Sequence, residues 1–249
     1  MKADGFDLVD DFSDLFGMNA AGTDAKMRNT KESILEAQFT SGAGNWCTWM
    51  FGRDLVNWNN NFTWAKWVTP SRDLISAFKQ EGDEVRFKES IVYYDCNWSN
   101  YYPSDNYPFM YKCRSANSSI IKYRYADVLL LKAEALIMQD TPDLEGAADI
   151  IDKVRDRAKL GALPTSVRSN KNVLLNALLK ERRLELAFEG QRWFDLVRLD
   201  KVEEVMNAVY SKDSGRKAQI YTFDKNSYRL PIPQSVIDAN DKIHQNPGY

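Results

Sequence analysis

The sequence predicts a mainly α protein in which a tetratricopeptide-like helical hairpin supports a loop-rich, irregular region. Two apolar stripes with helical spacing, over residues 123–137 and 144–158, predict the hairpin. Residues 40–118 are rich in Trp, Tyr, Asn, Ser and Gly and show little helical period, which predicts long loops and short strands. A dense run of charged and apolar residues at 181–196 predicts helices whose charges are held in a network.

Length and charge limit the classes of protein that the chain can represent. With 249 residues it can bury a sizeable core, as one large domain or two small ones. The formal net charge is −2, and the 33 basic and 35 acidic residues are interspersed, which excludes the basic footprint of a nucleic-acid-binding protein. The chain has no run of 18 apolar residues and begins without the apolar stretch of a signal peptide, so we expect it to be soluble as given.

The cysteine and histidine content disfavours metal and triad chemistry. Cys47, Cys96 and Cys113 match no metal-binding spacing, and we interpret them as buried small hydrophobic residues, with a Cys96–Cys113 disulfide as the alternative. A histidine-based zinc site or a Ser-His-Asp triad could use only His244, which we interpret as a surface or tail residue. We therefore expect no metal, no cofactor and no catalytic residue.

The first 120 residues are predicted to hold only short regular elements. A short helix is expected over residues 6–16 and a short strand over residues 34–39. A second helix is expected over residues 71–80, because the segment 70–73 (PSRD) is a plausible helix start.

Two consecutive helices joined by a short turn make up the predicted hairpin. Apolar residues fall on one stripe of each helix, and residues 141–143 (TPD) break the pattern between them. Gly161 is expected to end the second helix. Small residues at the contact allow the two axes to approach closely: Ala126, Ala133, Ala147 and Ala148.

A third helix is expected over residues 172–188, and Gly190 separates it from a short helix over residues 193–198. Three pairs with i,i+3 spacing are expected to satisfy one another locally: Arg182 with Glu185, Arg192 with Asp195, and Asp195 with Arg198. The tail is predicted to be extended, since residues 230–233 (LPIP) cannot be helical and residues 246–248 (NPG) are typical of a turn.

Five ordered motifs give the chain a family resemblance. They are TPS with DL at 69–74, YRYADVLLLKAEA at 123–135, VRDRA at 154–158, ERRLELAFEGQRWFDL at 181–196, and LPIPQS at 230–235 followed by NPGY at 246–249. Together they resemble the C-terminal half of a SusD/RagB-family protein. The resemblance implies a nutrient-binding lipoprotein on the outer-membrane surface of Bacteroidota. Such a protein acts as a lid on a TonB-dependent, SusC-like transporter and binds a glycan without breaking a bond.

The resemblance also implies that the chain is part of a longer fold. Family members are typically about twice as long, begin with a lipoprotein signal and a lipidated cysteine, and place several helix pairs before the region that matches this chain. We therefore expect the C-terminal part of a single SusD-like domain, without the N-terminal half of the family fold and without the lipid anchor that reaches the membrane. Residues 1–120 would be the loop-rich ligand-recognition region, 121–210 the helical scaffold and 211–249 the extended tail. The helices of residues 123–188 are then expected to expose apolar surface.

Aromatic residues in polar surroundings predict the ligand-binding site. Sugars present apolar C–H faces and hydroxyl edges, so their sites combine flat rings with polar donors and acceptors. Residues 57–61 (NWNNN) and 96–102 (CNWSNYY) set rings among polar residues, which favours exposure. The residues expected to contact the ligand are Trp58, Trp98, Tyr101, Tyr102, Asn97 and Asn59. Trp64 and Trp67 are assigned to the core, and burial under a loop is the alternative for any single tryptophan here.

Two other functions stay open at the level of sequence. One is a helical scaffold that binds only protein, which would bury its aromatic residues. The other is a glycoside hydrolase, since the acidic residues of 181–195 resemble the paired carboxylates that such an enzyme holds across a cleft. Their helical spacing and the neighbouring arginines favour a structural ion network instead.

Overall fold

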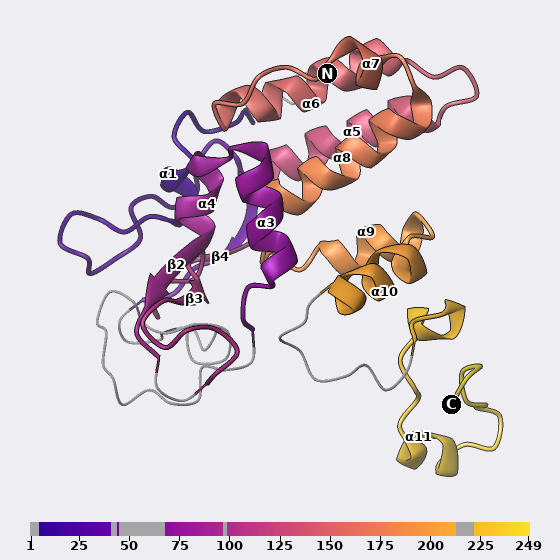
Figure 1. Ribbon diagram of the computed structural model, residues 1–249. Coiled ribbons are helices and arrows are strands. Elements are labelled where there is room, and N and C mark those ends of the chain that lie inside the picture. The colour runs from indigo at the N-terminus through magenta and orange to yellow at the C-terminus, as the bar shows by residue number, and fades with distance from the viewer. Residues whose placement is uncertain (1–4, 41–43, 45–67, 97–98, 213–221) are drawn as a thin grey trace. The chain divides into compact units, whose positions relative to one another are not determined.

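The structure, a computed structural model, describes residues 5–40, 44, 68–96, 99–212 and 222–249 (Figure 1). The chain divides into two compact units, Met1–Gly190 and Gln191–Tyr249. The described part is mainly helical with a few short strands, which confirms the predicted fold class. None of the helices in this part is long and apolar enough to cross a membrane. The predicted division at residues 120 and 210 stays a prediction.

Three long helices of the first unit form the predicted scaffold. They are α5 (Tyr125–Met138), α6 (Leu144–Arg157) and α8 (Lys171–Glu185), with the short α7 (Thr165–Arg168) between α6 and α8. Helix α5 packs against both α6 and α8 (Figure 1). The alanines predicted at the hairpin contact have no exposed surface: Ala126, Ala133, Ala147 and Ala148. The tetratricopeptide-like hairpin is therefore confirmed.

Capping residues explain where two of these helices begin. The Asp143 carboxylate accepts a hydrogen bond from the Gly146 N–H at 2.9 Å and begins α6 directly after the predicted breaker. Asn170 begins α8 in the same way. Helix α6 ends earlier than Gly161, because Lys159 takes a left-handed conformation with a φ of 61°.

A two-stranded sheet connects the N-terminal segment to the start of α5. Strand β1 (Ser33–Ala37) pairs antiparallel with β4 (Ile120–Arg124), and the register shifts twice along the pair. The strand predicted over residues 34–39 is thereby confirmed within two residues.

The helix predicted over residues 6–16 is wrong over most of its length, because only α1 (Ser13–Phe16) is helical. Before α1, the Asp7 N–H donates to the Lys31 carbonyl at 2.9 Å. The Val9 N–H donates to the Glu32 carboxylate at the same distance of 2.9 Å. These long-range bonds take backbone donors that a helix would use locally, and they compete with the helical pattern.

Two helices and a β-hairpin lead from residue 72 to residue 110. They are α3 (Arg72–Glu81), α4 (Glu84–Ser90), β2 (Ile91–Tyr94) and β3 (Tyr107–Met110). Ser71 caps α3 as predicted and accepts a hydrogen bond from the Leu74 N–H at 3.1 Å. Helix α4 was not predicted, since the residues that it buries are Arg86, Glu89 and Ser90 rather than an apolar stripe.

The second unit holds short helices and the tail. Its elements are α9 (Arg192–Arg198), α10 (Val202–Lys212), the 3₁₀ helix η1 (Lys225–Tyr228) and α11 (Gln234–Asp238). Helix α10 packs against α9 and η1. Residues 230–233 carry no regular secondary structure, as the two prolines predicted. His244 is exposed in the tail, which agrees with its interpretation as a surface residue.

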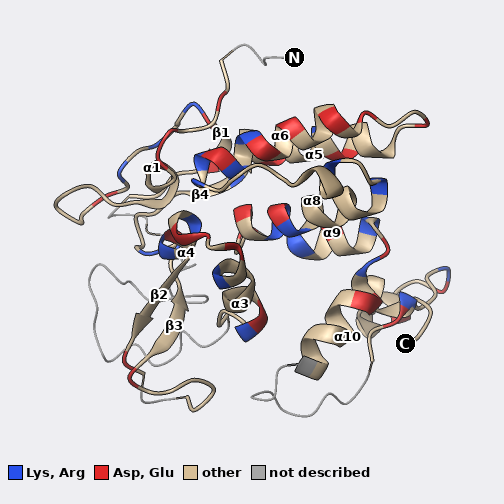
Figure 2. Ribbon diagram, turned by 45° about the horizontal axis from the view of Figure 1, so that its top comes forward, with Lys and Arg blue, Asp and Glu red and all other residues tan. Residues whose placement is uncertain are grey.

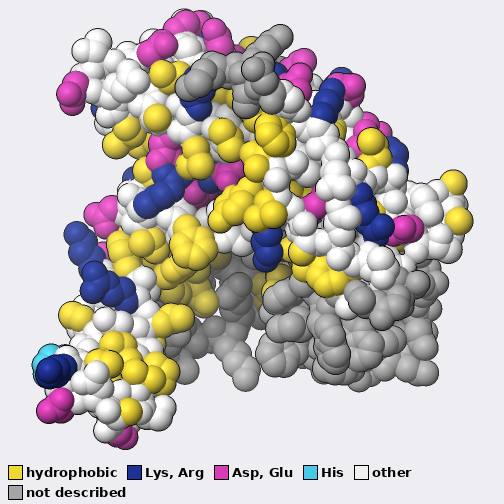
Figure 3. Space-filling view, turned by 180° about the vertical axis from the view of Figure 1, so that it is seen from behind, with side chains coloured by type: hydrophobic (Ala, Val, Ile, Leu, Met, Phe, Trp, Pro, Cys, Tyr) yellow, Lys and Arg dark blue, Asp and Glu magenta, His cyan; other side chains and the backbone are white. Residues whose placement is uncertain are grey.

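The scaffold helices leave apolar side chains in contact with solvent. On α5 the exposed fractions are 46% for Val128, 41% for Leu131 and 53% for Met138, and on α8 the value for Val173 is 42%. Single exposed apolar side chains are ordinary on a protein surface, so the expectation for residues 123–188 stays a prediction. Figure 3 shows hydrophobic side chains interspersed with charged ones on one face of the molecule.

Cys96 and Cys113 are buried and form no disulfide with each other, so the interpretation as small hydrophobic residues is confirmed for both. Cys47 lies outside the described residues. Within the described ranges, no group of three or more His, Cys, Asp or Glu residues could hold a metal ion.

Candidate ligand-binding site

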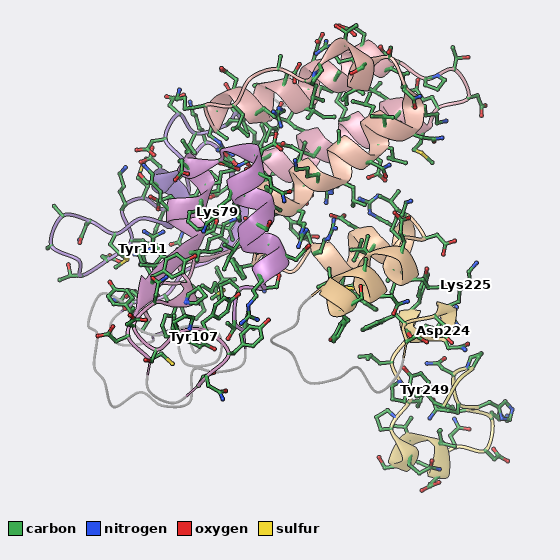
Figure 4. All side chains as sticks on the ribbon, in the orientation of Figure 1. Lys79, Tyr107, Tyr111, Asp224, Lys225 and Tyr249 are labelled. Atoms are coloured by element: carbon green, nitrogen blue, oxygen red, sulfur yellow. The ribbon has the colours of Figure 1, made fainter. Side chains whose placement is uncertain are left out.

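The β2–β3 hairpin presents the described part of the predicted ligand-binding region. Its pairs Val92–Phe109 and Tyr94–Tyr107 lie on one face of the hairpin. On this face Cys96, Tyr107 and Phe109 are buried together. Residues 95–106 connect the two strands and carry Tyr101 and Tyr102, so this small core supports the loop. Figure 4 shows Tyr107 at the start of β3, beside that loop, and Tyr111 just beyond the end of β3.

Arg72, the first residue of α3, lies against both tyrosines of the loop. Its guanidinium carbon is 4.1 Å from the centre of the Tyr101 ring and 4.5 Å from the centre of the Tyr102 ring. The guanidinium also donates a hydrogen bond to the Tyr101 carbonyl. The two rings meet edge to face with centroids 4.8 Å apart. This group, Arg72 with Tyr101 and Tyr102, is called the hairpin-tip cluster below.

Hydrogen bonds hold the hairpin-tip cluster in place. The Tyr102 hydroxyl donates to the Pro70 carbonyl at 2.7 Å, at the residue before the α3 cap. The Tyr102 ring meets the buried Tyr107 ring edge to face at 5.5 Å. The Tyr107 hydroxyl lies 3.3 Å from the Ser99 hydroxyl and 3.2 Å from the Thr69 hydroxyl. The tyrosine rings are therefore held from both the hairpin and the start of α3.

An open cavity of about 860 Å³ lies beside this cluster. Its lining combines rings, hydroxyls, an amide and a guanidinium: Arg72, Cys96, Ser99, Asn100, Tyr101, Tyr102, Pro103 and Ser104. Flat rings can stack on the apolar face of a sugar, while the hydroxyls and the amide can exchange hydrogen bonds with its hydroxyl edge. The lining thus has the chemistry that a carbohydrate site requires.

The structure brings together two of the six residues predicted to bind the ligand. Tyr101 and Tyr102 are half-buried and line the same cavity. The other four predicted residues lie outside the described part of the chain: Trp58, Asn59, Asn97 and Trp98. The same holds for Trp64 and Trp67, which were assigned to the core.

Sequence reasoning missed Arg72, because its partner loop lies 29 residues further along the chain. Ser99 and Asn100 were part of the polar aromatic segment but were not singled out. The alternation of rings with polar residues in 96–102 was the signal that could have included them.

The acidic residues of the 181–196 run lie in a different place, in a buried ion network. Glu185 has no exposed surface and pairs with three arginines from other elements. Arg124 at the end of β4 lies 2.5 Å from it, Arg86 of α4 lies 2.9 Å from it, and Arg157 of α6 is its third partner. Figure 2 shows the charged positions of α8 beside those of α4.

Neighbouring carboxylates extend the same network. Glu181 lies 2.6 Å from Arg86, and Glu189 lies 2.7 Å from Arg124. Glu32, which precedes β1, lies 2.7 Å from Arg124 and 3.0 Å from Arg157. Each carboxylate therefore faces arginine from a distant part of the chain.

Two of the three predicted local pairs can be compared with the structure. The pair of Asp195 with Arg198 is confirmed at 2.8 Å. The pair of Arg182 with Glu185 is wrong, because Arg182 of α8 lies 2.8 Å from Asp127 of α5 instead. Burial explains the difference: a buried charge needs several partners in good geometry, and one neighbour on the same helix supplies too few.

The charges of the network shift the titration of its members. Burial opposes the ionisation of Glu185 and Glu189, but the adjacent arginines outweigh it and hold both pKa values below the usual range. Burial raises the pKa of Glu181 in spite of Arg86. Burial also lowers the pKa of Lys112 to about 8, against the attraction of Glu189. Each of these groups is paired with opposite charge inside the protein, which is the behaviour of a structural network.

Comparison with known proteins agrees with this architecture. The model of the SusD family matches residues 110–249. SusD-like protein P38 of Formosa agariphila is 43% identical over 99 residues, which are 37% of this chain and 19% of that protein. SusD-like protein P2 of the same organism is 36% identical over 143 residues, which are 55% of this chain and 27% of that protein.

A solved structure shows the same fold. The surface glycan-binding protein A of Bacteroides thetaiotaomicron, in complex with laminarihexaose, is 20% identical and aligns with a TM-score of 0.71. The alignment covers 98% of this chain and 56% of that protein. The chain thus spans about half of the solved structure and about a quarter or less of the two Formosa proteins.

Proposed function

Because the chain belongs to the SusD family, we propose that it takes part in binding a glycan at the outer-membrane surface and in delivering it to a TonB-dependent, SusC-like transporter, without catalysis. The observation that carries the proposal is the hairpin-tip cluster and its open cavity, on a chain whose residues 110–249 match the family model. The ligand contacts proposed are Tyr101 and Tyr102, with the four residues outside the described part of the chain: Trp58, Asn59, Asn97 and Trp98.

The ligand class follows from the rings and from a relative. Half-buried tyrosines beside hydroxyl and amide groups suit a sugar, as argued above. The solved structure with the same fold was obtained with laminarihexaose, a glucose oligomer. A laminarin-type oligosaccharide is therefore the first glycan to test.

The absence of catalysis is proposed from the carboxylates. Glu181, Glu185 and Glu189 are buried or nearly so and are engaged by arginines, whereas a glycosidase holds two carboxylates on either side of a bound sugar. A hydrolase would release reducing sugar in excess over protein. Sustained release of reducing sugar from laminarihexaose, maltohexaose or xylohexaose would overturn this part of the proposal.

Isothermal titration calorimetry tests the binding. Laminarihexaose, maltohexaose and xylohexaose are titrated into the protein and into the Tyr101→Ala, Trp58→Ala and Trp98→Ala variants. The matched control is Tyr123→Ala, which removes a ring that is 56% exposed on β4, away from the cavity lining. We expect at least one glycan to bind, with weaker binding in the three site variants only.

Two outcomes would contradict the proposal. If all four variants bind as the unchanged protein does, the assigned residues are wrong. If no glycan binds, the ligand belongs to another class of nutrient. A scaffold that binds only protein would bury its rings, and the half-buried Tyr101 and Tyr102 do not favour that alternative.

A further inference from the structure

The first unit holds a second cavity. It has a volume of about 430 Å³ and shares no lining residue with the first cavity. Most of its lining is apolar, contributed by the end of α1, the end of β3 and the strand β4. The apolar residues are Phe16, Val68, Met110, Cys113, Ile120, Ile121 and Phe188.

The volume and lining match those of small-molecule sites. Such sites are mostly apolar concavities of about 300–1,000 Å³ with a few polar groups that orient the ligand. An engineered dry cavity of about 150 Å³ already binds benzene, so a space of this size holds a ring with a short chain.

Lys112 supplies the main polar group of the lining. Its ammonium donates to the Glu189 carboxylate at 2.6 Å and to the Glu185 carbonyl at 2.9 Å. It also lies 4.8 Å from the centre of the Phe16 ring. An ammonium has three N–H donors, and these two hydrogen bonds use two of them.

Two further polar side chains of the lining, Ser119 and Lys122, are hydrogen-bond donors. The Ser119 hydroxyl oxygen is buried and has no hydrogen-bond partner among the described residues. Lys122 is exposed at the same cavity. Among the described lining residues Glu189 is the one that carries a carboxylate, and it is already paired with Arg124 at 2.7 Å as well as with Lys112.

We propose that this cavity binds a small, mostly apolar carboxylate, whose apolar body lies among Phe16, Met110 and Ile121 and whose head accepts from Lys112 and Ser119. After rotation about χ1, the Ser119 hydroxyl donates to the carboxylate head and thereby gains the hydrogen bond that it lacks among the described residues. The exposed Lys122 adds positive charge at the opening and favours an anion over a neutral molecule.

This site is independent of the proposed glycan function. A glycan presents many hydroxyls and needs polar partners along its length, whereas the described lining of this cavity offers mostly apolar walls with ammonium or hydroxyl donors from Lys112, Ser119 and Lys122. Loss of glycan binding in the Tyr101→Ala variant would leave the second cavity unchanged, and the two results can be separated.

The test uses 4-phenylbutyrate as the probe and 4-phenyl-1-butanol as its neutral counterpart. Methyl groups of isoleucine and methionine are labelled with ¹³C, and NMR spectra are recorded during titration with each probe. We expect saturable shifts at Ile120, Ile121 and Met110, with about tenfold tighter binding of the carboxylate, as for one charge-assisted hydrogen bond.

Two variants examine the assigned residues. Ser119→Ala removes a hydroxyl that has no partner among the described residues, so the fold is expected to persist while carboxylate affinity falls severalfold and alcohol affinity does not change. Ser76→Ala, on the exposed face of α3, is the matched control and should bind as the unchanged protein does. Val68→Phe reduces the cavity volume and should weaken both probes.

Three results would overturn the proposal. They are shifts that do not saturate at millimolar probe, equal affinity for the acid and the alcohol, and unchanged carboxylate affinity in Ser119→Ala. The methyl spectrum itself reports whether each variant is folded, so a misfolded Val68→Phe leaves the Ser119→Ala comparison decisive.

Discussion

The buried ion network and the hairpin-tip cluster both depend on arginine, but they use it in opposite surroundings. Arg86 and Arg124 are at most 1% exposed and face carboxylates from several elements. Arg72 is half-buried and faces two tyrosine rings and a carbonyl beside an open cavity.

The difference shows which region holds the fold and which one can meet a ligand. A charge taken out of water needs opposite charge close by, so the paired carboxylates and arginines of the network serve the fold. An arginine stacked on a ring at the surface orients that ring and still leaves polar groups near solvent. Substitutions in the network should therefore change stability, and substitutions in the hairpin-tip cluster should change affinity.

The largest effect is expected for Glu185→Ala. This change leaves three buried arginines short of a partner, and removing one member of a buried pair typically costs about 3–5 kcal/mol. Urea denaturation followed by circular dichroism measures the free energy of unfolding. The control is Asp149→Ala, whose carboxylate is 68% exposed beside Arg168, with an expected change of about 1 kcal/mol or less. Equal effects from the two variants would remove the distinction between network and surface.

The network should also make stability depend on acid. The pKa values of Glu185 and Glu189 are held below the ordinary value of 4.5 for a glutamate, so the unfolded chain takes up protons first as the pH falls. Stability that both residues contribute above pH 4.5 is then lost as the pH falls through their folded values. Burial raises the pKa of Glu181 and Asp83. At these two residues the folded state binds protons more tightly than the unfolded chain, so their contribution to stability falls as the pH rises above their ordinary pKa values.

The measurement is urea denaturation of the protein and of Glu189→Gln between pH 3 and 7. Since Gln does not titrate, the variant should lose less stability below pH 4.5 than the unchanged protein does. Parallel curves for the two proteins would show that Glu189 does not carry this dependence.

A smaller effect, on binding alone, is expected for Tyr101→Ala. Loss of one aromatic contact is worth about 0.5–1.5 kcal/mol, which is a two- to tenfold weaker glycan affinity by calorimetry. The melting temperature should move little, because the ring is half-buried at a loop. A large loss of stability without a change in affinity would place Tyr101 in the core instead.

The smallest effect is expected for Arg72→Lys. The charge is kept, but the planar group that lies over Tyr101 and Tyr102 is lost, which is worth about 0.5–1 kcal/mol at an exposed site. Glycan affinity should fall about two- to fivefold by the same titration. If affinity does not change, Arg72 does not orient the rings.

The parts of the fold that depend on residues close together in the sequence were predicted correctly. The hairpin of α5 and α6, the Ser71 cap and the non-helical residues 230–233 follow from apolar period, capping and proline. Helix α4 and the segment before α1 did not, because buried charge and long-range hydrogen bonds decide them.

The candidate site divides in the same way. The alternation of rings and polar residues indicated Tyr101 and Tyr102 directly from the sequence. Arg72 depends on a contact between α3 and the hairpin loop, and the partners of Glu185 depend on four elements meeting. The spacing of residues within one helix cannot predict these contacts between elements.

Arg157 pairs with Glu32, which lies 125 positions earlier in the chain. Glu32 also pairs with Arg124. During synthesis Glu32 therefore stays hydrated and unpaired until Arg157, and with it most of the first unit, has left the ribosome. Contacts of this kind lengthen the average separation between interacting residues and slow folding. Completion of the network is thus expected to be a late step, after the local hairpin of α5 and α6 has formed.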